Sequence, residues 1–349
     1  MVKEVVAVDL FCGVGGLTHG LQKAGLDVVA GVDIDPRCQF PFEVNNRSLF
    51  CLKSVDQLKK GELDSWYNGA DIRVLAGCAP CQPFSTYSQG SKSAKDEKWK
   101  LLGEFQRLIE ETRPEIVTME NVPQLIGHEV FVEFVGSLEK LKYSVSYKLV
   151  QCEKYGLPQT RKRLVLLASK FGEIELIKPT HNKPEKHRTV KDALHGLPCL
   201  QAGKKSNKDP LHKSAALSDL NLDRIKSSKQ GGTWRDWPEH LVAECHKKKT
   251  GKSYVSVYGR MEWNRPSPTV TTQFFGFGNG RFGHPTQNRA ISLREGAILQ
   301  SFPRNYQFTK PGVDPEFTVV GRLIGNAVPV RLGQIIGKSI MRHIENHAK

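Results

Sequence analysis

The cysteine at position 81 has the side chain and the setting of a catalytic nucleophile. It lies within Gly77-Cys-Ala-Pro-Cys-Gln-Pro-Phe-Ser85 and follows a short apolar run, Val74–Ala76, that predicts a strand. Open α/β sheets bind their ligands at the carboxyl ends of the strands. A thiolate at such a position can attack an electrophilic carbon once its charged form is stabilised or a base lies nearby. We therefore predict Cys81 as the nucleophile.

Cys78 and Cys81 also have the Cys-x-x-Cys spacing of a redox pair or of half a zinc site. Neither a second cysteine pair nor a suitably spaced pair of histidines accompanies them in the sequence. A single activated thiolate is the better interpretation, and no metal site is predicted. The redox and metal alternatives stay open on this spacing alone.

A carboxylate and an amide stand side by side at another predicted strand end. Met119-Glu-Asn-Val-Pro123 closes an apolar run that begins at Ile116. If the strand ends converge, Glu120 lies near Cys81 and can bind the edge of a base, while Asn121 holds the local loop. Taken alone, the motif is an ordinary strand end.

Two arginines alternate in Gln159-Thr-Arg-Lys-Arg163. In an extended segment Arg161 and Arg163 point to one side, where both can meet the same anionic or carbonyl-bearing ligand. The alternative is a solvated edge strand that has no ligand.

A glycine turn follows the first predicted strand, in Asp9-Leu-Phe-Cys-Gly-Val-Gly-Gly16. Glycines at such a turn let the backbone approach a ligand closely. The spacing departs from the G-x-G-x-x-G pattern of dinucleotide-binding proteins, so a nicotinamide-dependent dehydrogenase fits poorly. Asp33 ends the next predicted strand, at the position where doubly wound proteins bind a ribose hydroxyl. The two features together indicate a nucleoside-bearing cofactor without a phosphate clamp.

These side chains need a scaffold that brings strand ends together. Short apolar runs alternate with helical patterns over roughly the first 175 residues, which predicts a doubly wound, mainly parallel α/β sheet. Leu101, Phe105 and Leu108 have helical spacing before Pro114 and predict a crossover helix. The predicted strands are Val5–Phe11, Val28–Val32, Val74–Ala76, Ile116–Met119 and Leu164–Ala168.

The later part of the chain has a different texture and a basic charge. Residues 181–260 carry 17 Lys and Arg against 8 Asp and Glu and show little periodicity, which predicts an irregular lobe with a basic face. The whole chain of 349 residues has a formal net charge of +15, which favours nucleic acid as the partner. The alternative for this stretch is a solvated surface insertion.

The sequence also predicts the compartment. The eight cysteines have no regular spacing and read as reduced thiols. The first residues resemble a strand with an acidic residue inside it, and no run approaches the ~18 apolar residues of a membrane span. We expect a soluble, cytoplasmic protein.

Taken together, the motifs resemble those of the DNA cytosine-5 methyltransferase family, in its bacterial restriction-modification type. Their order, spacing and identity agree from residue 5 to about residue 340, and the basic stretch falls where the family has its variable target-recognition region. The matching motifs are Asp9-Leu-Phe-Cys-Gly-Val-Gly-Gly16, Pro80-Cys-Gln82 with Phe84-Ser85, Glu120-Asn-Val122, Gln159-Thr-Arg-Lys-Arg163, Arg265-Pro-Ser-Pro-Thr-Val270 and Gly325-Asn-Ala-Val-Pro329.

This resemblance implies a fold, a reaction and two domains. The sheet would be of the S-adenosylmethionine-dependent methyltransferase type, with residues 1–178 and 322–349 forming the catalytic domain and 179–321 the smaller target-recognition domain. Cys81 would add to carbon 6 of a flipped-out cytosine in double-stranded DNA, and carbon 5 would then accept the methyl group. Glu120 would hold the N3 and the exocyclic amine of the base, and Arg163, helped by Arg161, would contact its carbonyl.

The resemblance also implies a cofactor pocket for S-adenosylmethionine. Phe11 would pack on the adenine, the turn from Gly13 to Gly16 would hold the methionine moiety, and Asp33 would bind the ribose hydroxyls. The full set of implied cofactor-binding residues is Asp9, Phe11, Gly13, Gly15, Gly16, Asp33, Ile34, Val55, Asp56, Pro80 and Asn326.

One position departs from the family pattern. The family commonly has an acidic residue just before a Val or Ile that contacts the adenine amine, whereas here Ser54 precedes Val55 and Asp56 follows it. The residue that serves the adenine amine is therefore left open between Ser54 and Asp56.

Two polar or aromatic loops have two interpretations each. The segment 85–95 is polar and contains glycine, so it can be a closing lid or an ordinary surface loop. The segment Phe275–Gly283 can contact the DNA backbone beside the recognition region, or it can be a packing loop of the small lobe.

Two rival functions are weighed against DNA methylation. A tRNA methyltransferase has a similar core, but the Cys-Phe-Thr signature of those relatives is absent from the basic stretch. A catalytically silent DNA-binding module would have no reason to retain both Cys81 and Glu120. We expect a monomer associated with the bacterial nucleoid, and the sequence does not predict which DNA site is modified.

Overall fold

The computed structural model describes residues 3–80 and 93–347, with side chains for 3–80 and 100–347. The described chain forms two compact units. Unit 1 consists of Met1–Tyr155, Lys162–Pro179 and Val328–Lys349, and unit 2 consists of Gly156–Arg161 and Thr180–Ala327. Residues 156–161 and 322–327, which the sequence assigned to the catalytic domain, thus group with unit 2 by their contacts.

Unit 1 is built on a seven-stranded sheet in the order β3-β2-β1-β4-β5-β8-β6. Strands β3, β2, β1, β4 and β5 are parallel, while β8 is antiparallel to both β5 and β6. The prediction of a doubly wound, mainly parallel sheet is confirmed. The strands are β1 (Val5–Leu10), β2 (Asp27–Asp33), β3 (Leu49–Leu52), β4 (Ile72–Gly77), β5 (Ile116–Asn121), β6 (Ser144–Gln151) and β8 (Lys162–Ser169).

Alternation along β1 explains how the sheet builds the core. Val6, Val8 and Leu10 point to one face of the sheet, where they join a buried apolar cluster with Phe105 and Phe134. A central strand of a parallel sheet is covered on both faces, which is why this segment is an almost continuous apolar run in the sequence.

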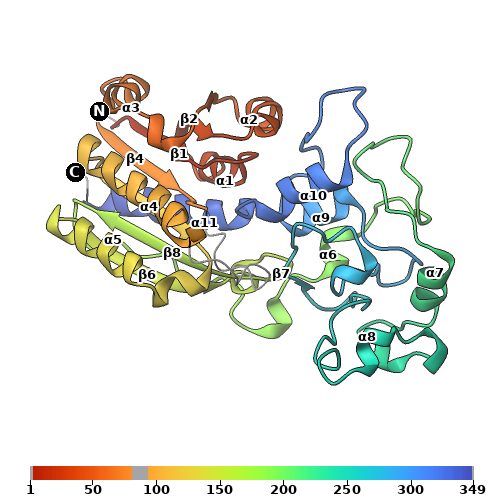
Figure 1. The fold of residues 1–349 in the computed structure, drawn as a ribbon. Coiled ribbons are helices and arrows are strands. Elements are labelled where there is room, and N and C mark those ends of the chain that lie inside the picture. The colour runs from red at the N-terminus through yellow and green to blue at the C-terminus, as the bar shows by residue number, and fades with distance from the viewer. Residues whose placement is uncertain (1–2, 81–92, 348–349) are drawn as a thin grey trace. The chain divides into compact units, whose positions relative to one another are not determined.

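The helices of unit 1 form two groups. Helices α3, α4 and α5 pack side by side, as do α2, α1 and α11, and Figure 1 shows α4 and α5 together on one side of the sheet. No helix in the described part of the chain is both long and apolar enough to cross a membrane. The helices are α1 (Gly16–Gln22), α2 (Gln39–Asn46), α3 (Lys60–Tyr67), α4 (Ser93–Thr112), α5 (Glu129–Lys140) and α11 (Val330–His347).

Helix α11, from the far end of the chain, packs tightly against α1. A Cβ atom on Gly20 of α1 would lie only 2.4 Å from the carbonyl oxygen of Val330. Only glycine permits this approach, so the end of the chain is fixed beside the helix that follows the first glycine turn.

Strands β3 and β6 were not predicted from the sequence. Both lie at the edges of the sheet, where side chains such as Tyr147 and Leu149 are 44 % and 51 % exposed and weaken the apolar pattern. Strand β8 was predicted, but its antiparallel direction was not. This direction matters because the first residues of β8 lie beside the last residues of β5.

Unit 2 contains few and short regular elements. Its strands β7 (Gln159–Thr160) and β9 (Ser267–Pro268) pair in parallel. An apolar cluster contains Ile225, Trp234 and Trp237. The helices are α6 (Val190–Leu194), α7 (Asp219–Lys226), α8 (Glu244–Lys247), α9 (Leu293–Leu299) and α10 (Phe317–Asn326).

Buried guanidinium groups tie the loops of unit 2 together. The side chain of Arg260 donates hydrogen bonds to the backbone carbonyls of Ile225, Ser228, His284 and Gln287, with donor–acceptor distances of 2.7–3.2 Å. An unpaired buried carbonyl costs free energy, and no sheet in the described part of the chain binds these carbonyls, so the guanidinium group of Arg260 supplies the hydrogen bonds.

Candidate active site

The carboxyl ends of the parallel strands meet at one edge of the sheet in unit 1. The backbone N–H of Cys12 donates to the carbonyl of Val32 at 3.0 Å, and that of Cys78 donates to the carbonyl of Leu10 at 3.2 Å. The register also places the end of β4 beside Met119 of β5. The residues that follow β1, β2 and β4 therefore lie at the same edge as the end of β5.

Glu120 is the buried carboxylate of this edge. Its side chain is 3 % exposed, and its Oε1 lies 2.9 Å from Nε of Arg163 in an ion pair. The Sγ of Cys78 donates a hydrogen bond to Oε2 at 3.0 Å. The ion pair with Arg163 does not have the geometry of a hydrogen bond, so Oε1 has no hydrogen-bond partner among the residues that the structure describes. The carboxylate is thus fixed in place while one oxygen retains its capacity to accept a hydrogen bond.

Asn121 secures the segment that leads to residue 81. Its side-chain Nδ2 donates to the carbonyl of Ala79 at 3.1 Å, and its Oδ1 accepts from the backbone N–H of Val122 at 2.8 Å. These bonds join the end of β5 to the residues after β4. The predicted nucleophile Cys81 and residues 85–92 of the predicted lid segment lie outside the described residues, and residues 93–95 begin α4.

The first glycine turn and the end of β2 form a joint backbone cradle. The Oδ2 of Asp33 accepts a hydrogen bond from the N–H of Gly13, and Oδ1 accepts one from the N–H of Asp35, both at 2.9 Å. Burial raises the pKa of Asp33 from its ordinary value. Gly13 has a φ of 52° and open space where a Cβ would lie. A side chain there would be strained and would enter that space.

Apolar groups flank this cradle. Ile34 follows β2 with 69 % of its side chain exposed, which is unusual for an aliphatic residue, whereas Val55 is buried. Phe11 has a φ of 59° and is half-buried after β1. Gly15, with a φ of 84°, precedes Gly16, the first residue of α1. Pro80 is exposed.

The alternatives for the adenine amine, Ser54 and Asp56, are joined to each other. The Ser54 hydroxyl donates to the Asp56 carboxylate and is the main cause of a lowered pKa of Asp56. Lys100 Nζ lies 3.8 Å from the same carboxylate. Asp56 is exposed, so it retains contact with solvent.

Asp9 lies inside the protein rather than on the surface of the cradle. It is fully buried, its Oδ2 accepts a hydrogen bond from the Thr18 hydroxyl at 2.6 Å, and its Oδ1 has no hydrogen-bond partner in the described chain. Burial raises the pKa of Asp9 to about 7. Its predicted contact with the cofactor stays a prediction.

Arg161 and Arg163 have different protein partners, although their alternation predicts that both can meet the same ligand. Arg161 is buried in unit 2 and donates to the carbonyls of Val270 and Gly325 at 3.1 and 3.4 Å. Arg163 begins β8 beside Glu120 in unit 1. The segment leaves β7 for β8 between the two arginines, so the two side chains have different surroundings.

Gln159 is a structural residue that the sequence analysis did not single out for this role. Its Nε2 donates to the carbonyl of Leu299, and its Oε1 accepts from the N–H of Val270 at 2.8 Å. It therefore joins three segments of unit 2 that lie far apart in the sequence, and no local pattern indicates such a link.

The remaining predicted residues of unit 2 have packing environments. Asn326 ends α10, and its predicted cofactor contact stays a prediction. In the segment Phe275–Gly283, Phe277 and Phe282 are buried. Arg281 donates to the carbonyls of Gly231 and Gly232. These contacts favour the packing interpretation of this loop.

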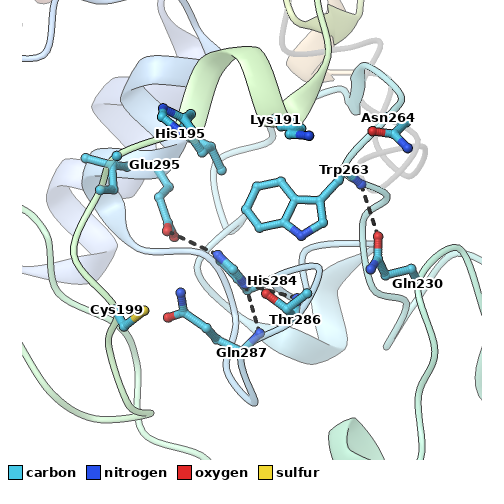
Figure 2. A pocket seen from close by; sticks show the side chains of 13 residues that line it. Lys191, His195, Cys199, Gln230, Trp263, Asn264, His284, Thr286, Gln287 and Glu295 are labelled. Carbon is cyan, nitrogen blue, oxygen red and sulfur yellow. Dashed lines mark hydrogen bonds and ion pairs between the residues drawn. The ribbon is translucent and has the colours of Figure 1, made fainter.

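A separate pocket of about 590 Å³ lies within unit 2. Figure 2 shows the side chains that line it. The polar groups at its floor bind other groups of the protein. Nδ1 of His284 accepts hydrogen bonds from the backbone N–H groups of Thr286 and Gln287. Arg289 forms an ion pair with Glu295 at 2.7 Å. Burial lowers the pKa of His284 to about 4, so the ring is neutral at physiological pH. Its remaining hydrogen is on Nε2, 3.8 Å from Glu295. This arrangement primarily stabilises the pocket wall.

Comparison with known proteins assigns a family to the fold and site. The family model for C-5 cytosine-specific DNA methylase matches residues 5–342. The Type II methylase M.HgiDII of Herpetosiphon aurantiacus is 54 % identical over 97 % of this chain and 95 % of its own. The Type II methyltransferase M1.HphI of Haemophilus parahaemolyticus is 31 % identical over 96 % of this chain and 86 % of its own.

Solved structures resemble the fold across its whole length. A protein described as a DNA modification methyltransferase from an E. coli prophage has a TM-score of 0.75 at 23 % identity, covering 98 % of this chain and 99 % of its own. The Dnmt2 methyltransferase of S. pombe has a TM-score of 0.62 at 18 % identity, covering 98 % of each chain. At these identities the likeness concerns the fold.

Proposed function

The chain belongs to the C-5 cytosine-specific DNA methylase family and is a DNA cytosine-5 methyltransferase; we propose that it uses S-adenosylmethionine and a covalent adduct between Cys81 and a flipped-out cytosine. The observation that carries this proposal is the arrangement around Glu120. A buried carboxylate, paired with Arg163, ends β5, and Asn121 beside it holds the segment that leads to Cys81.

The cradle in unit 1 fits the proposed cofactor. S-adenosylmethionine, when bound, supplies an electrophilic methyl group on its sulfonium. Asp33, whose oxygens already accept from two backbone N–H groups, would also accept from the ribose hydroxyls. Exposed Ile34 and half-buried Phe11 would cover the adenine, and buried Val55 would lie beneath it. Ser54 or Asp56 would contact the adenine amine, and exposed Pro80 would lie at the rim of the pocket. The open space at Gly13 would take the methionine end, next to Gly15 and Gly16.

Cys81 would make carbon 5 of cytosine reactive by adding to carbon 6. The new sulfur–carbon bond moves the electron pair of the carbon 5–carbon 6 double bond to carbon 5, which becomes nucleophilic. Glu120 would accept a hydrogen bond from the exocyclic amine and share a proton with N3, and transfer of that proton to N3 would neutralise the negative charge that develops on the ring, while Arg163 holds the carboxylate. Carbon 5 would then bond to the methyl carbon as the bond from that carbon to the sulfonium breaks. Transfer of the carbon 5 proton to a base would restore the double bond and expel the Cys81 thiolate.

The two units would divide this task. A base stacked in a duplex is out of reach of Cys81 and Glu120, so the cytosine must rotate out of the helix. We assign the chemistry to unit 1 and target recognition to unit 2, whose stretch 181–260 is rich in Lys and Arg. Arg161 would act within unit 2 by joining its segments and not by touching the base.

The covalent step has a direct test. We expect a duplex with 5-fluorocytosine in place of cytosine to trap the enzyme, because fluorine cannot leave carbon 5 as a cation after methyl transfer. The trapped complex would survive denaturing electrophoresis and would require both S-adenosylmethionine and Cys81. A complex that forms equally with Cys81→Ala would exclude Cys81 as the nucleophile.

We also propose that the enzyme acts as a monomer on double-stranded DNA in the bacterial cytoplasm, at the nucleoid, within a restriction-modification system. The bacterial Type II enzymes among its relatives support this setting. Sedimentation of the pure protein with and without DNA tests the monomer, and a dimer under both conditions would overturn it.

A further inference from the structure

The thiol of Cys78 has no part in the proposed reaction, yet it lies against the central carboxylate. Its Sγ is 3.0 Å from Oε2 of Glu120, and its backbone N–H is bonded to the carbonyl of Leu10. The two side chains are 42 positions apart in the sequence and come from the ends of adjacent strands, β4 and β5. The contact is therefore set by the sheet and not by a local turn.

The two contacts of the Glu120 carboxylate act on different oxygens. Arg163 lies at Oε1 and Cys78 at Oε2, so rotation of the carboxyl plane would break one of the two contacts. A carboxylate has about four acceptor directions, so two contacts leave capacity for a base. Cytosine would engage both oxygens, one accepting from the exocyclic amine and the other sharing a proton with N3, and the orientation of the plane then decides whether both bonds form.

Electrostatics keeps Cys78 in the role of a donor. Ionisation of this thiol would place a second negative charge 3.0 Å from the buried Glu120 carboxylate. The neutral thiol is favoured, and a neutral thiol is a poor nucleophile. Cys78 thus does not compete with Cys81 for the base.

From these contacts we infer that Cys78 is a positioning residue for the reaction, which holds the Glu120 carboxyl plane in the orientation that binds cytosine. This inference rests on the proposed function. The thiol acts through Glu120 and does not touch the base, so its removal should slow the chemical step with little change in cofactor affinity.

Substitutions at Cys78 test the inference by single-turnover methyl transfer to DNA. We expect Cys78→Ala to lower the rate about tenfold, and Cys78→Ser, which keeps a donor, to remain within about threefold of the wild type. Cys152→Ala removes a buried thiol elsewhere in unit 1 and is the matched control. If Cys78→Ala fails to fold, Cys78→Val replaces it, because valine fills the space without donating a hydrogen bond.

A double-mutant cycle with Glu120→Gln separates positioning from a general structural effect. We expect Cys78→Ala to change the rate less than about twofold when Glu120 is already Gln, because the two residues act as one unit. Independent, multiplicative losses would overturn the inference, as would an unchanged rate in Cys78→Ala or equal losses in the Ser and Ala variants. Wild-type enzyme that labels no DNA would instead refute the proposed function.

Discussion

The two units of this protein achieve stability by different means. In unit 1 a seven-stranded sheet satisfies the backbone, and side chains such as Phe105 pack into one apolar core. In unit 2 regular structure is sparse, and buried side chains such as Arg260 and the Arg289–Glu295 pair satisfy the loops. The parallel strands of unit 1 fix the positions of the strand ends, which suits catalysis. In unit 2 a few buried donors hold the loops, so the remaining loop residues are free to vary in sequence.

Removal of one buried group from each unit should give the largest effects. We expect Arg260→Met to cost about 3–5 kcal/mol in the free energy of unfolding of unit 2, because it leaves several buried carbonyls without donors. Phe105→Ala should cost about 3–5 kcal/mol in unit 1 through the cavity it leaves. Denaturant titration measures both, followed by hydrogen exchange on each unit. If either variant lowered the protection of amides from hydrogen exchange equally in both units, the two units would not be stabilised separately.

Acidity should act on the two units in opposite directions. Asp9 has its pKa raised from 3.8 to about 7, so its contribution to stability is full below pH 3.8 and is lost as the pH rises through 7. His284 has its pKa lowered from 6.5 to about 4, so its contribution is full above pH 6.5 and is lost as the pH falls through 4. Each changes stability by about 1.4 kcal/mol per pH unit at most.

Between pH 4 and 6.5 we therefore expect acidification to stabilise unit 1 through Asp9 and to destabilise unit 2 through His284. In unit 1 the effect of Asp9 is opposed by His19 and His343, because burial lowers the pKa of both. Hydrogen exchange on amides of each unit, corrected for the intrinsic pH dependence of exchange, reports the two trends. Asp9→Asn should flatten the trend of unit 1 and leave that of unit 2. A parallel response of both units in the wild type would show that these two groups do not set the pH dependence.

A smaller effect should separate cofactor binding from DNA binding. Asp33→Ala removes the acceptor at the end of β2, and we expect it to weaken S-adenosylmethionine binding about 10–100-fold. Calorimetric titration measures this change, and DNA binding by a gel-shift assay should stay the same. Asp64→Ala, at a more exposed carboxylate of α3, is the control. Unchanged cofactor affinity would remove Asp33 from the proposed pocket.

The smallest effect concerns the exposed lysines of unit 2. Replacement of Lys247, Lys248 and Lys249 by alanine should reduce the salt dependence of DNA binding. The slope of the logarithm of the binding constant against the logarithm of the salt concentration should become shallower by about 0.9 for each DNA phosphate that a lysine no longer neutralises. The rate of methyl transfer at saturating DNA should not change. Lys59→Ala with Lys60→Ala on unit 1 is the control, and an equal change in slope from that pair would contradict the assignment of DNA binding to unit 2.

Residues at the ends of apolar runs were predictable from the sequence. Asp33 and Glu120 each end such a run, and parallel strands carry both to one edge, where the structure has them. The bond between Cys78 and Glu120 was not predictable, because it depends on which strands are neighbours. The partners of Arg161 and Arg260 are backbone carbonyls far away in the sequence, and carbonyls are common to every residue. Strand β6 escaped prediction because its edge position leaves several of its side chains exposed.

The most direct test of the proposed chemistry is methyl transfer from labelled S-adenosylmethionine to unmethylated duplex DNA, with tRNA as a parallel substrate and Cys81→Ala as the control. We expect label at carbon 5 of cytosine in the DNA, none in the tRNA and none with the variant. Label in tRNA alone, or label in DNA that persists in Cys81→Ala, would contradict the proposed substrate or the proposed nucleophile.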